Sequence, residues 1–186
     1  VITYPFEIKN KIATLKENSA PGPDGISSRL LMEAPDLLCI ALSILFNKSF
    51  MEGIVPYEWK QVNITPIYKK GLKADPNNYR PLSLSSVVCK VLENLIKDQI
   101  TKFLETNNLF SASQHGFRKK HSCLTNLITF TNDATKSLDA GIPVDVIYFD
   151  MAKAFDKVSH QILLNKLHRI GIHGRLFSWI KNWLTN

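Results

Sequence analysis

The chain of 186 residues suits one domain, or one and part of another, and its 45% hydrophobic residues can form a substantial core. It carries 23 Lys and Arg against 16 Asp and Glu, a net charge of +7. The longest apolar stretch, Leu37–Phe46, is too short to span a bilayer, and no signal peptide is recognisable.

The positive charge is concentrated in two stretches. Residues 57–90 hold six basic and two acidic residues, and residues 151–186 hold six basic residues and one acidic residue. Such patches favour a polyanionic partner, because neutralised phosphates release counterions. Ordinary solubility charge is the competing interpretation.

The three cysteines indicate a reducing compartment. They are odd in number, far apart and set in apolar helical patterns, so we expect buried free thiols. The protein is therefore predicted to be intracellular, either nuclear or cytoplasmic. The cysteines are Cys39, Cys89 and Cys123.

The first half of the chain is predicted to be mainly helical. Apolar side chains recur at helical spacing over Pro5–Lys16, Pro35–Phe50 and Ser86–Phe103. Gly53 is expected to end the second helix and Ser86 to cap the third. The second helix is expected to bury one apolar stripe: Leu37, Leu38, Ala41, Leu42, Leu45, Phe46 and Phe50.

Two strands and a basic turn are predicted between these helices. Trp59–Lys70 and Tyr79–Leu84 are rich in residues that favour extended structure, and Pro66 restricts the first to an edge or irregular strand. The turn signals between them predict a hairpin. Its basic residues suit a clamp on a triphosphate, although a plain solvated hairpin has the same composition. They are Lys69, Lys70, Lys73 and Arg80.

A basic loop with one aromatic residue, 114–121, follows the third long helix. Phe117, Arg118 and Lys119 suit a nucleic-acid strand through stacking and phosphate contacts, whereas burial of Phe117 is the structural alternative. Ser122 is expected to cap a helix that runs to Leu138. Its inward residues are predicted to be Leu127, Ile128, Ala134 and Leu138.

The chemistry is predicted at Val144–Asp156. The run Val144–Phe149 is rich in β-branched and aromatic residues and is typical of a short buried strand, which places Asp150 at its tip. Asp150 and Asp156 suit a divalent cation with a phosphate-bearing ligand, and helix capping by Asp150 is the alternative. Two further helices are predicted after Ser159 and from Arg175. The fold class is thus α+β, dominated by helices.

Several strings resemble motifs of the reverse transcriptases of non-LTR (LINE-type) retrotransposons. They occur in the family's order along nearly the whole chain. Lys120-His121 departs from the residues that many members have there. The strings are Pro-Gly-Pro-Asp-Gly at 21–25, Ile-Thr-Pro-Ile-Tyr-Lys-Lys-Gly at 64–71, Asn-Tyr-Arg-Pro-Leu-Ser-Leu at 78–84, Gln-His-Gly-Phe-Arg at 114–118 and Asp-Met-Ala-Lys-Ala-Phe-Asp at 150–156.

The resemblance implies roles for individual residues. Asp150 would bind the catalytic metal ions, Mg²⁺ or Mn²⁺, and Phe155 would lie under the sugar of the incoming nucleotide. Arg80 would hold its phosphates, assisted by Lys69 or Lys70. Because a triphosphate must touch the metal ligand and the basic clamp together, we expect Lys69, Lys70 and Arg80 to face Asp150. The implied partners are an RNA template, a DNA primer and deoxynucleoside triphosphates, with no membrane.

The resemblance also implies a partial right-hand polymerase. Residues 1–140 would form the fingers and early palm, and residues 141–186 the start of the catalytic palm, truncated at the C-terminus. The family's second carboxylate motif is not in the sequence, so we expect the chain to need the remainder of the polymerase domain for activity. A non-catalytic nucleic-acid-binding remnant is the alternative function. An aspartyl-phosphate phosphatase is set aside, because Ala152 stands where that chemistry needs an acid.

Overall fold

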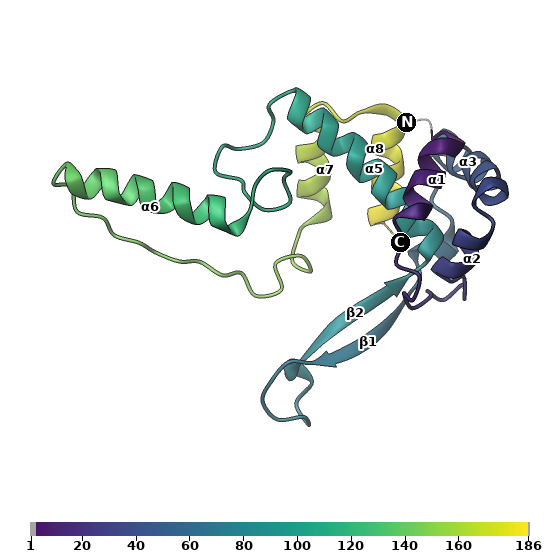
Figure 1. The fold of residues 1–186 in the computed structure, drawn as a ribbon, viewed down its shortest axis with the longest axis horizontal. Coiled ribbons are helices and arrows are strands. Elements are labelled where there is room, and N and C mark those ends of the chain that lie inside the picture. The colour runs from purple at the N-terminus through teal and green to yellow at the C-terminus, as the bar shows by residue number, and fades with distance from the viewer. Residues whose placement is uncertain (1–2, 186) are drawn as a thin grey trace. The chain divides into compact units, whose positions relative to one another are not determined.

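The computed structural model describes residues 3–185, which form two compact units. The first unit comprises the chain up to Lys102 and from Ser159 onward, and the second comprises Phe103–Val158. Figure 1 shows their helices and the one hairpin. The described chain is therefore a mixed, helix-rich α+β protein, as predicted.

The first unit holds most of the helices. Its elements, with their bounds, are α1 (Pro5–Ala13), α2 (Ser28–Glu33), α3 (Pro35–Glu52), α4 (Tyr57–Lys60), β1 (Val62–Tyr68), the 3₁₀ turn η1 (Pro76–Asn78), β2 (Tyr79–Ser85), most of α5 (Val87–Thr106), α7 (His160–Arg169) and α8 (Gly174–Leu184). The second unit contains the end of α5 and α6 (Cys123–Asp139).

The helix-end signals in the sequence are confirmed. Gly53 closes α3 with a left-handed φ of 67°, a conformation that glycine adopts without strain. Ser86 accepts a hydrogen bond from the amide of Cys89 at the start of α5. Ser122 caps α6 and Ser159 caps α7. α5 ends at a turn formed by Asn107 and Asn108.

Some element predictions are wrong in extent. α1 ends at Ala13 rather than Lys16. The short helices α2 and α4 were not predicted, because six and four residues hold too little periodicity to read. The capping signal for α2 is nevertheless present, since Ser27 accepts a hydrogen bond from the amide of Leu30.

The core of the first unit lies between α1, α3, α5 and α8. Ile8 and Ile12 of α1 pack with Phe46 and Phe50 of α3 and with the apolar face of α5. Trp179 of α8 joins this cluster and donates a hydrogen bond from its indole N–H to Ser49 Oγ at 2.9 Å. The last helix is thereby tied to a helix far away in the sequence.

The predicted stripe of α3 is partly wrong. Leu42, Phe46 and Phe50 are buried as expected, but Leu37 is 72% exposed and Leu45 is 41% exposed. α3 is apolar on nearly all sides, so its own pattern does not select the face that becomes core. Cys39 of this helix is buried, and so is Cys89, whereas Cys123 is exposed, contrary to expectation.

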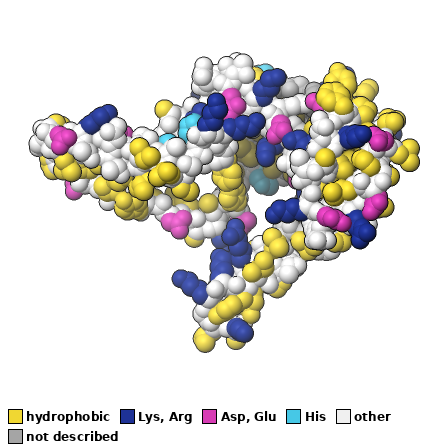
Figure 2. All heavy atoms as spheres, in the orientation of Figure 1, with side chains coloured by type: hydrophobic (Ala, Val, Ile, Leu, Met, Phe, Trp, Pro, Cys, Tyr) yellow, Lys and Arg dark blue, Asp and Glu magenta, His cyan; other side chains and the backbone are white. Residues whose placement is uncertain are grey.

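The second unit has little core. No residue of α6 is buried. Of its four expected inward residues, Ala134 is partly buried, whereas Leu127, Ile128 and Leu138 are exposed at 60%, 58% and 62%. Figure 2 shows hydrophobic atoms at the surface along this helix and the segment after it. α6 is amphipathic as predicted, but nothing among the described residues buries its apolar face.

Candidate nucleotide and nucleic-acid interface

The hairpin of the first unit presents two different faces. β1 and β2 pair antiparallel, with Ile67 opposite Arg80, and form the only sheet in residues 3–185. Side chains alternate between the faces of a strand, and directly opposed residues share one. Arg80 therefore lies on the face of Ile67, and the tyrosine pair Tyr68 and Tyr79 lies on the other face.

Lys69 shares the face of Arg80. The amide of Lys69 donates to the carbonyl of Asn78 at 2.8 Å, so the ladder continues one residue beyond β1. Alternation from Ile67 places Lys69 on the Arg80 face, while Lys70 enters the bend. All three basic side chains are exposed, and none of the ion pairs in the described chain involves them.

The tip of the hairpin is held by its own hydrogen bonds. The Tyr68 hydroxyl donates to the carbonyl of Gly71, and the Tyr79 hydroxyl donates to that of Lys73 at 2.9 Å. The side-chain amide of Asn78 donates to the carbonyl of Leu72 at 2.9 Å. The Lys73 ammonium lies over the Tyr68 ring, 5.9 Å from its centroid. The loop is thus ordered by side chains other than Lys69, Lys70 and Arg80.

The Pro-Gly-Pro-Asp-Gly string packs against the base of the hairpin. Gly22 is buried, and a Cβ there would lie 2.5 Å from the backbone nitrogen of Ser86. Asp24 accepts a hydrogen bond from the amide of Ile26, and Gly25 has a φ of 69°. Glycine at position 22 is therefore required by the close approach of two backbones.

Phe117 of the second unit is displayed to solvent. It is 92% exposed and has a φ of 61°, a left-handed conformation that is costly for a bulky side chain. The alternative that Phe117 is simply buried is thus wrong. An exposed aromatic ring, held out by a strained backbone, is suited to stacking on a base.

Arg118, by contrast, is engaged within its own loop. Its guanidinium donates to the carbonyls of Ser111 and Gln114 at 3.2 and 3.3 Å. It also lies over the ring of Phe110, 4.8 Å from the centroid. These contacts make Arg118 a brace for the loop, and Lys119 beside it is exposed.

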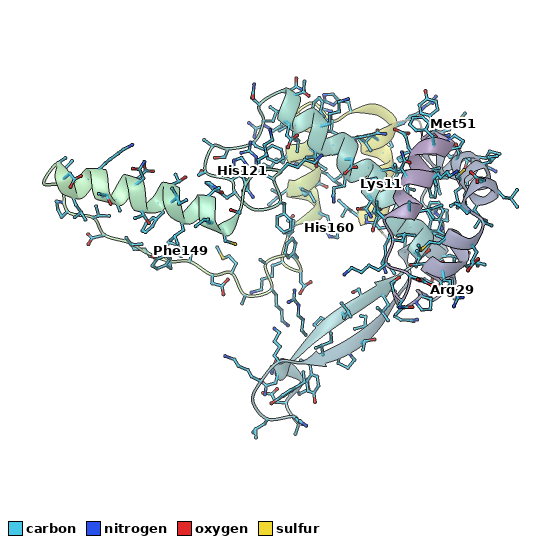
Figure 3. The ribbon with its side chains drawn as sticks, in the orientation of Figure 1. Lys11, Arg29, Met51, His121, Phe149 and His160 are labelled. Atoms are coloured by element: carbon cyan, nitrogen blue, oxygen red, sulfur yellow. The ribbon has the colours of Figure 1, made fainter. Side chains whose placement is uncertain are left out.

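The loop leads directly into α6. His115 lies within hydrogen-bond distance of Thr125 Oγ1 at 3.0 Å, and its ring contacts that of His121 edge to face. Thr125 also completes the capping box with Ser122. Figure 3 labels His121 just before this helix.

The strand predicted at Val144–Phe149 is not present. Residues 142–151 are in neither helix nor strand, and Ile147, Tyr148 and Phe149 are each at least 75% exposed. A strand needs a neighbour for its backbone hydrogen bonds, and β1 and β2 pair only with each other in the described chain. Figure 3 shows Phe149 on this extended segment.

Asp150 is exposed, but it does not end a strand, contrary to the prediction, and it does not cap a helix. Turns at 152–157 follow it, with Lys153 at a φ of 53°. In residues 3–185, no three His, Cys, Asp or Glu side chains gather in a way that could hold a metal ion. Asp150 and Asp156 therefore do not complete a metal site by themselves.

Phe117 and Phe155 come together within the second unit. Their ring centroids lie 6.4 Å apart in an edge-to-face arrangement, and Phe155 is 81% exposed. Both rings were singled out in the sequence, but nothing there indicated that they meet. The positions of two aromatic residues that are distant in sequence do not indicate whether their rings will be in contact.

The hairpin cations and Asp150 lie in different units. Lys69, Lys70 and Arg80 belong to the first unit, and Asp150 and Phe155 to the second. The expectation that Arg80 faces Asp150 stays a prediction.

The family follows from comparison with known proteins. Residues 67–186 match the family described as Reverse transcriptase (RNA-dependent DNA polymerase). This match covers more than half of the chain, from within the hairpin through the Asp150 segment. The chain therefore belongs to the reverse transcriptase family.

The curated relatives include polymerases of non-LTR retrotransposons. The chain is 31% identical over 179 residues to the RNA-directed DNA polymerase from mobile element jockey of Drosophila melanogaster, covering 96% of this chain and 19% of that protein. It is 29% identical over 181 residues to the probable RNA-directed DNA polymerase from transposon X-element of the same species, covering 97% and 20%. A Pol polyprotein from the type-1 element R2 of Popillia japonica is 25% identical over 169 residues, covering 90% and 22%.

The chain thus spans about a fifth of the length of these relatives. No described helix is long and apolar enough to cross a membrane.

Proposed function

We propose that this chain is the fingers and early palm of an RNA-directed DNA polymerase. In the complete domain it would help to add deoxynucleotides to a DNA primer on an RNA template. The observation that carries the proposal is the hairpin, whose Arg80 and Lys69 share one exposed face inside the segment that matches the family. Two unpaired cations on one face suit the phosphates of an incoming nucleotide.

The register also favours Lys69 over Lys70 as the second phosphate contact. A triphosphate bound at Arg80 is within reach of a side chain on the same face, whereas Lys70 points from a bend. Arg80 can make paired hydrogen bonds, and Lys69 would add a point charge.

The second unit would contact the nucleotide sugar and the nucleic-acid strand. Phe155 is proposed to lie under the sugar, and its contact with Phe117 would hold that ring in place. Phe117 would stack on a base and Lys119 would contact phosphate. Arg118 is proposed to act through the loop that it braces.

We propose that the complete polymerase transfers nucleotides by the two-metal route, and that Asp150 is a ligand that this chain supplies. Bound Mg²⁺ or Mn²⁺ would activate the 3′-hydroxyl and neutralise the triphosphate. No three His, Cys, Asp or Glu side chains gather as possible metal ligands in residues 3–185, so Asp150 would be one ligand of an incomplete set. Residues 1–186 alone are therefore expected to be inactive.

A primer-extension assay on an RNA template tests this proposal. The 186-residue chain should give no extension with either ion, because positioning supplies a large part of the rate. A longer chain that adds the remainder of the polymerase domain should extend the primer. Asp150→Ala in that longer chain should reduce the rate by roughly 10³-fold or more, the scale of losing a metal-binding group.

Asp145→Ala is the matched control, because Asp145 is an exposed aspartate on the same extended segment. It should leave extension nearly unchanged. Extension by the 186-residue chain that Asp150→Ala removes would contradict the proposed incomplete site. Equal losses for the two aspartates would contradict the role given to Asp150.

A further inference from the structure

The connection between the two strands of the hairpin is long. It runs from Lys69 to Asn78 and contains η1, whereas most hairpin loops have about two to five residues. The conformational freedom of a loop grows with its length, so this one needs additional contacts to keep a single shape. The cations proposed to hold phosphate, Lys69 and Arg80, lie beside its two ends.

Three side chains at the strand ends bind three consecutive carbonyls of this loop. The donors are two tyrosine hydroxyls and one asparagine amide. We call these three hydrogen bonds the tip lock. They run from Tyr68 to Gly71, from Asn78 to Leu72 and from Tyr79 to Lys73.

The donors of the tip lock are fixed by their surroundings. The rings of Tyr68 and Tyr79 meet with their centroids 5.7 Å apart and their planes at 63°. The Lys73 ammonium lies over the Tyr68 ring. Gly71 has a φ of 95°, and a Cβ there would lie 2.6 Å from the side-chain nitrogen of Asn78. Close packing therefore supports the hydrogen bonds.

The loop folds over the tyrosine face of the hairpin. Pro76 of the loop borders the same hollow as Ile64 and Pro81 of the strands. The register places both strand residues on the face of the tyrosines. Lys69 and Arg80, which belong to the other face, are exposed. The tip lock and the proposed phosphate contacts thus use opposite faces of one hairpin.

Each tyrosine of the tip lock directly precedes one of the proposed phosphate ligands. Tyr68 precedes Lys69, and Tyr79 precedes Arg80. Neighbouring side chains leave a strand on opposite faces, so a ring that is fixed on one face fixes the direction in which the next side chain leaves on the other. The hydroxyl bonds of the tyrosines thereby restrict where the two cations can lie.

We propose that Tyr68 and Tyr79 are positioning residues for the incoming nucleotide. Their hydroxyl bonds to the tip would hold Lys69 and Arg80 in the arrangement that the triphosphate needs, and this inference rests on the proposed function of those two cations. Groups that are held in place before binding lose less conformational entropy when the ligand arrives. The tip lock should therefore increase the affinity for the nucleotide rather than speed the chemical step.

Steady-state primer extension by a longer, active chain tests the role. Tyr68→Phe and Tyr79→Phe remove the hydroxyls and keep the rings. Each should raise the KM for the deoxynucleotide by about 3-fold or more, the scale of one hydrogen bond, and should change kcat by less than about 2-fold. Tyr57→Phe is the matched control, because Tyr57 is 71% exposed and lies outside the hairpin. It should leave both constants unchanged.

A double-mutant cycle separates positioning from a general effect on the fold. If Tyr79 acts through Arg80, then Tyr79→Phe should have a smaller effect on kcat/KM in an Arg80→Ala background than in the parent. A hydroxyl that only stabilises the fold would lower kcat/KM by the same factor in both backgrounds, and that result would contradict the positioning role.

Limited proteolysis of the 186-residue chain measures the tip lock without any need for activity. Trypsin cleaves after lysine, and Lys70 and Lys73 lie in the loop. The double variant with Tyr68→Phe and Tyr79→Phe should be cleaved there about 3-fold or more faster, because a loop that opens locally is more accessible to protease. Cleavage after Lys119, in the second unit, is the internal control and should be unchanged.

The results distinguish the two levels of the proposal. Unchanged tip cleavage would overturn the tip lock. An unchanged KM in both phenylalanine variants, while Lys69→Ala and Arg80→Ala still raise it, would overturn the positioning role alone. An unchanged KM in both alanine variants would overturn the phosphate contacts themselves and the positioning role with them, and the cleavage result would still show whether the tip lock exists.

Discussion

At the residue scale, some residues within the family motifs have a structural role and do not contact a ligand themselves. Gly22 lies inside the Pro-Gly-Pro-Asp-Gly string and has no room for a Cβ against Ser86. Arg118 lies inside a basic loop, yet its guanidinium is occupied by two carbonyls and a phenyl ring. Both residues act by shaping the surface on which others are displayed.

Gly22→Ala should therefore destabilise the first unit. The obstructing atoms are backbone, which cannot move aside cheaply, so we expect a loss of about 1–3 kcal/mol in the free energy of unfolding. Urea denaturation followed by circular dichroism measures it.

Gly116→Ala is the control for that measurement. A Cβ at Gly116 would meet only the Gln114 side chain at 3.6 Å, an ordinary contact. Its effect should stay within roughly 0.5 kcal/mol. Equal stabilities for the parent and Gly22→Ala would show that the hairpin base has more room than the structure indicates.

At the scale of elements, the hairpin and α6 differ in how they are completed. The hairpin satisfies its backbone with its own two strands and its tip with its own side chains. α6 satisfies its backbone alone but leaves its apolar face exposed, as does the segment before Asp150. The hairpin thus needs no further chain to satisfy its hydrogen bonds. α6 and the segment before Asp150 instead present apolar surfaces that a partner or another chain segment could bury.

Replacing the neighbouring lysines Lys69 and Lys70 should have different effects, because Lys69 shares the face of Arg80 and Lys70 lies in the bend. In a longer, active chain, Lys69→Ala should lower kcat/KM for the deoxynucleotide by about 10-fold or more, since a charged contact to phosphate is lost. Lys70→Ala should lower it by less than about 3-fold, because that side chain starts from the bend. Steady-state primer extension measures both. A larger loss for Lys70→Ala would reverse the assignment of faces.

At the scale of the whole molecule, charge is the property that the sequence and the proposed function share. The net charge is +7, and exposed cations occur in both units, at the hairpin and in the loop of Phe117. Some surface cations are neutralised locally. Lys9 pairs with Asp36, and that hydrogen bond raises the pKa of the lysine, while Lys11 pairs with Asp98. The unpaired cations are the ones expected to meet phosphates.

Binding of the 186-residue chain to single-stranded RNA should be weak, independent of sequence and sensitive to salt. Replacing Lys119 and Lys120 together by alanine should reduce the slope of log affinity against log salt by roughly 1.4, the value for two phosphate contacts. Fluorescence anisotropy with a labelled oligouridylate measures the slope.

Lys9→Ala provides the control, because the Lys9 charge is already paired with Asp36. It should leave the slope unchanged. Binding that ignores salt, or no binding at low salt, would refute the phosphate-based interface.

The sequence by itself determined the features whose causes lie within a few residues. Helix caps at Ser86, Ser122 and Ser159, the glycine end of α3 and the hairpin all follow from local hydrogen bonding and turn chemistry. The family was also readable there, because its motifs are short continuous strings.

Only the tertiary structure decided which surfaces are buried and which side chains meet. The exposed face of α3, the unpaired segment before Asp150 and the contact of Phe117 with Phe155 each depend on a distant neighbour or on its absence among the described residues. A residue's own neighbours in sequence carry its backbone preference, whereas burial and strand pairing require atoms supplied from elsewhere in the fold.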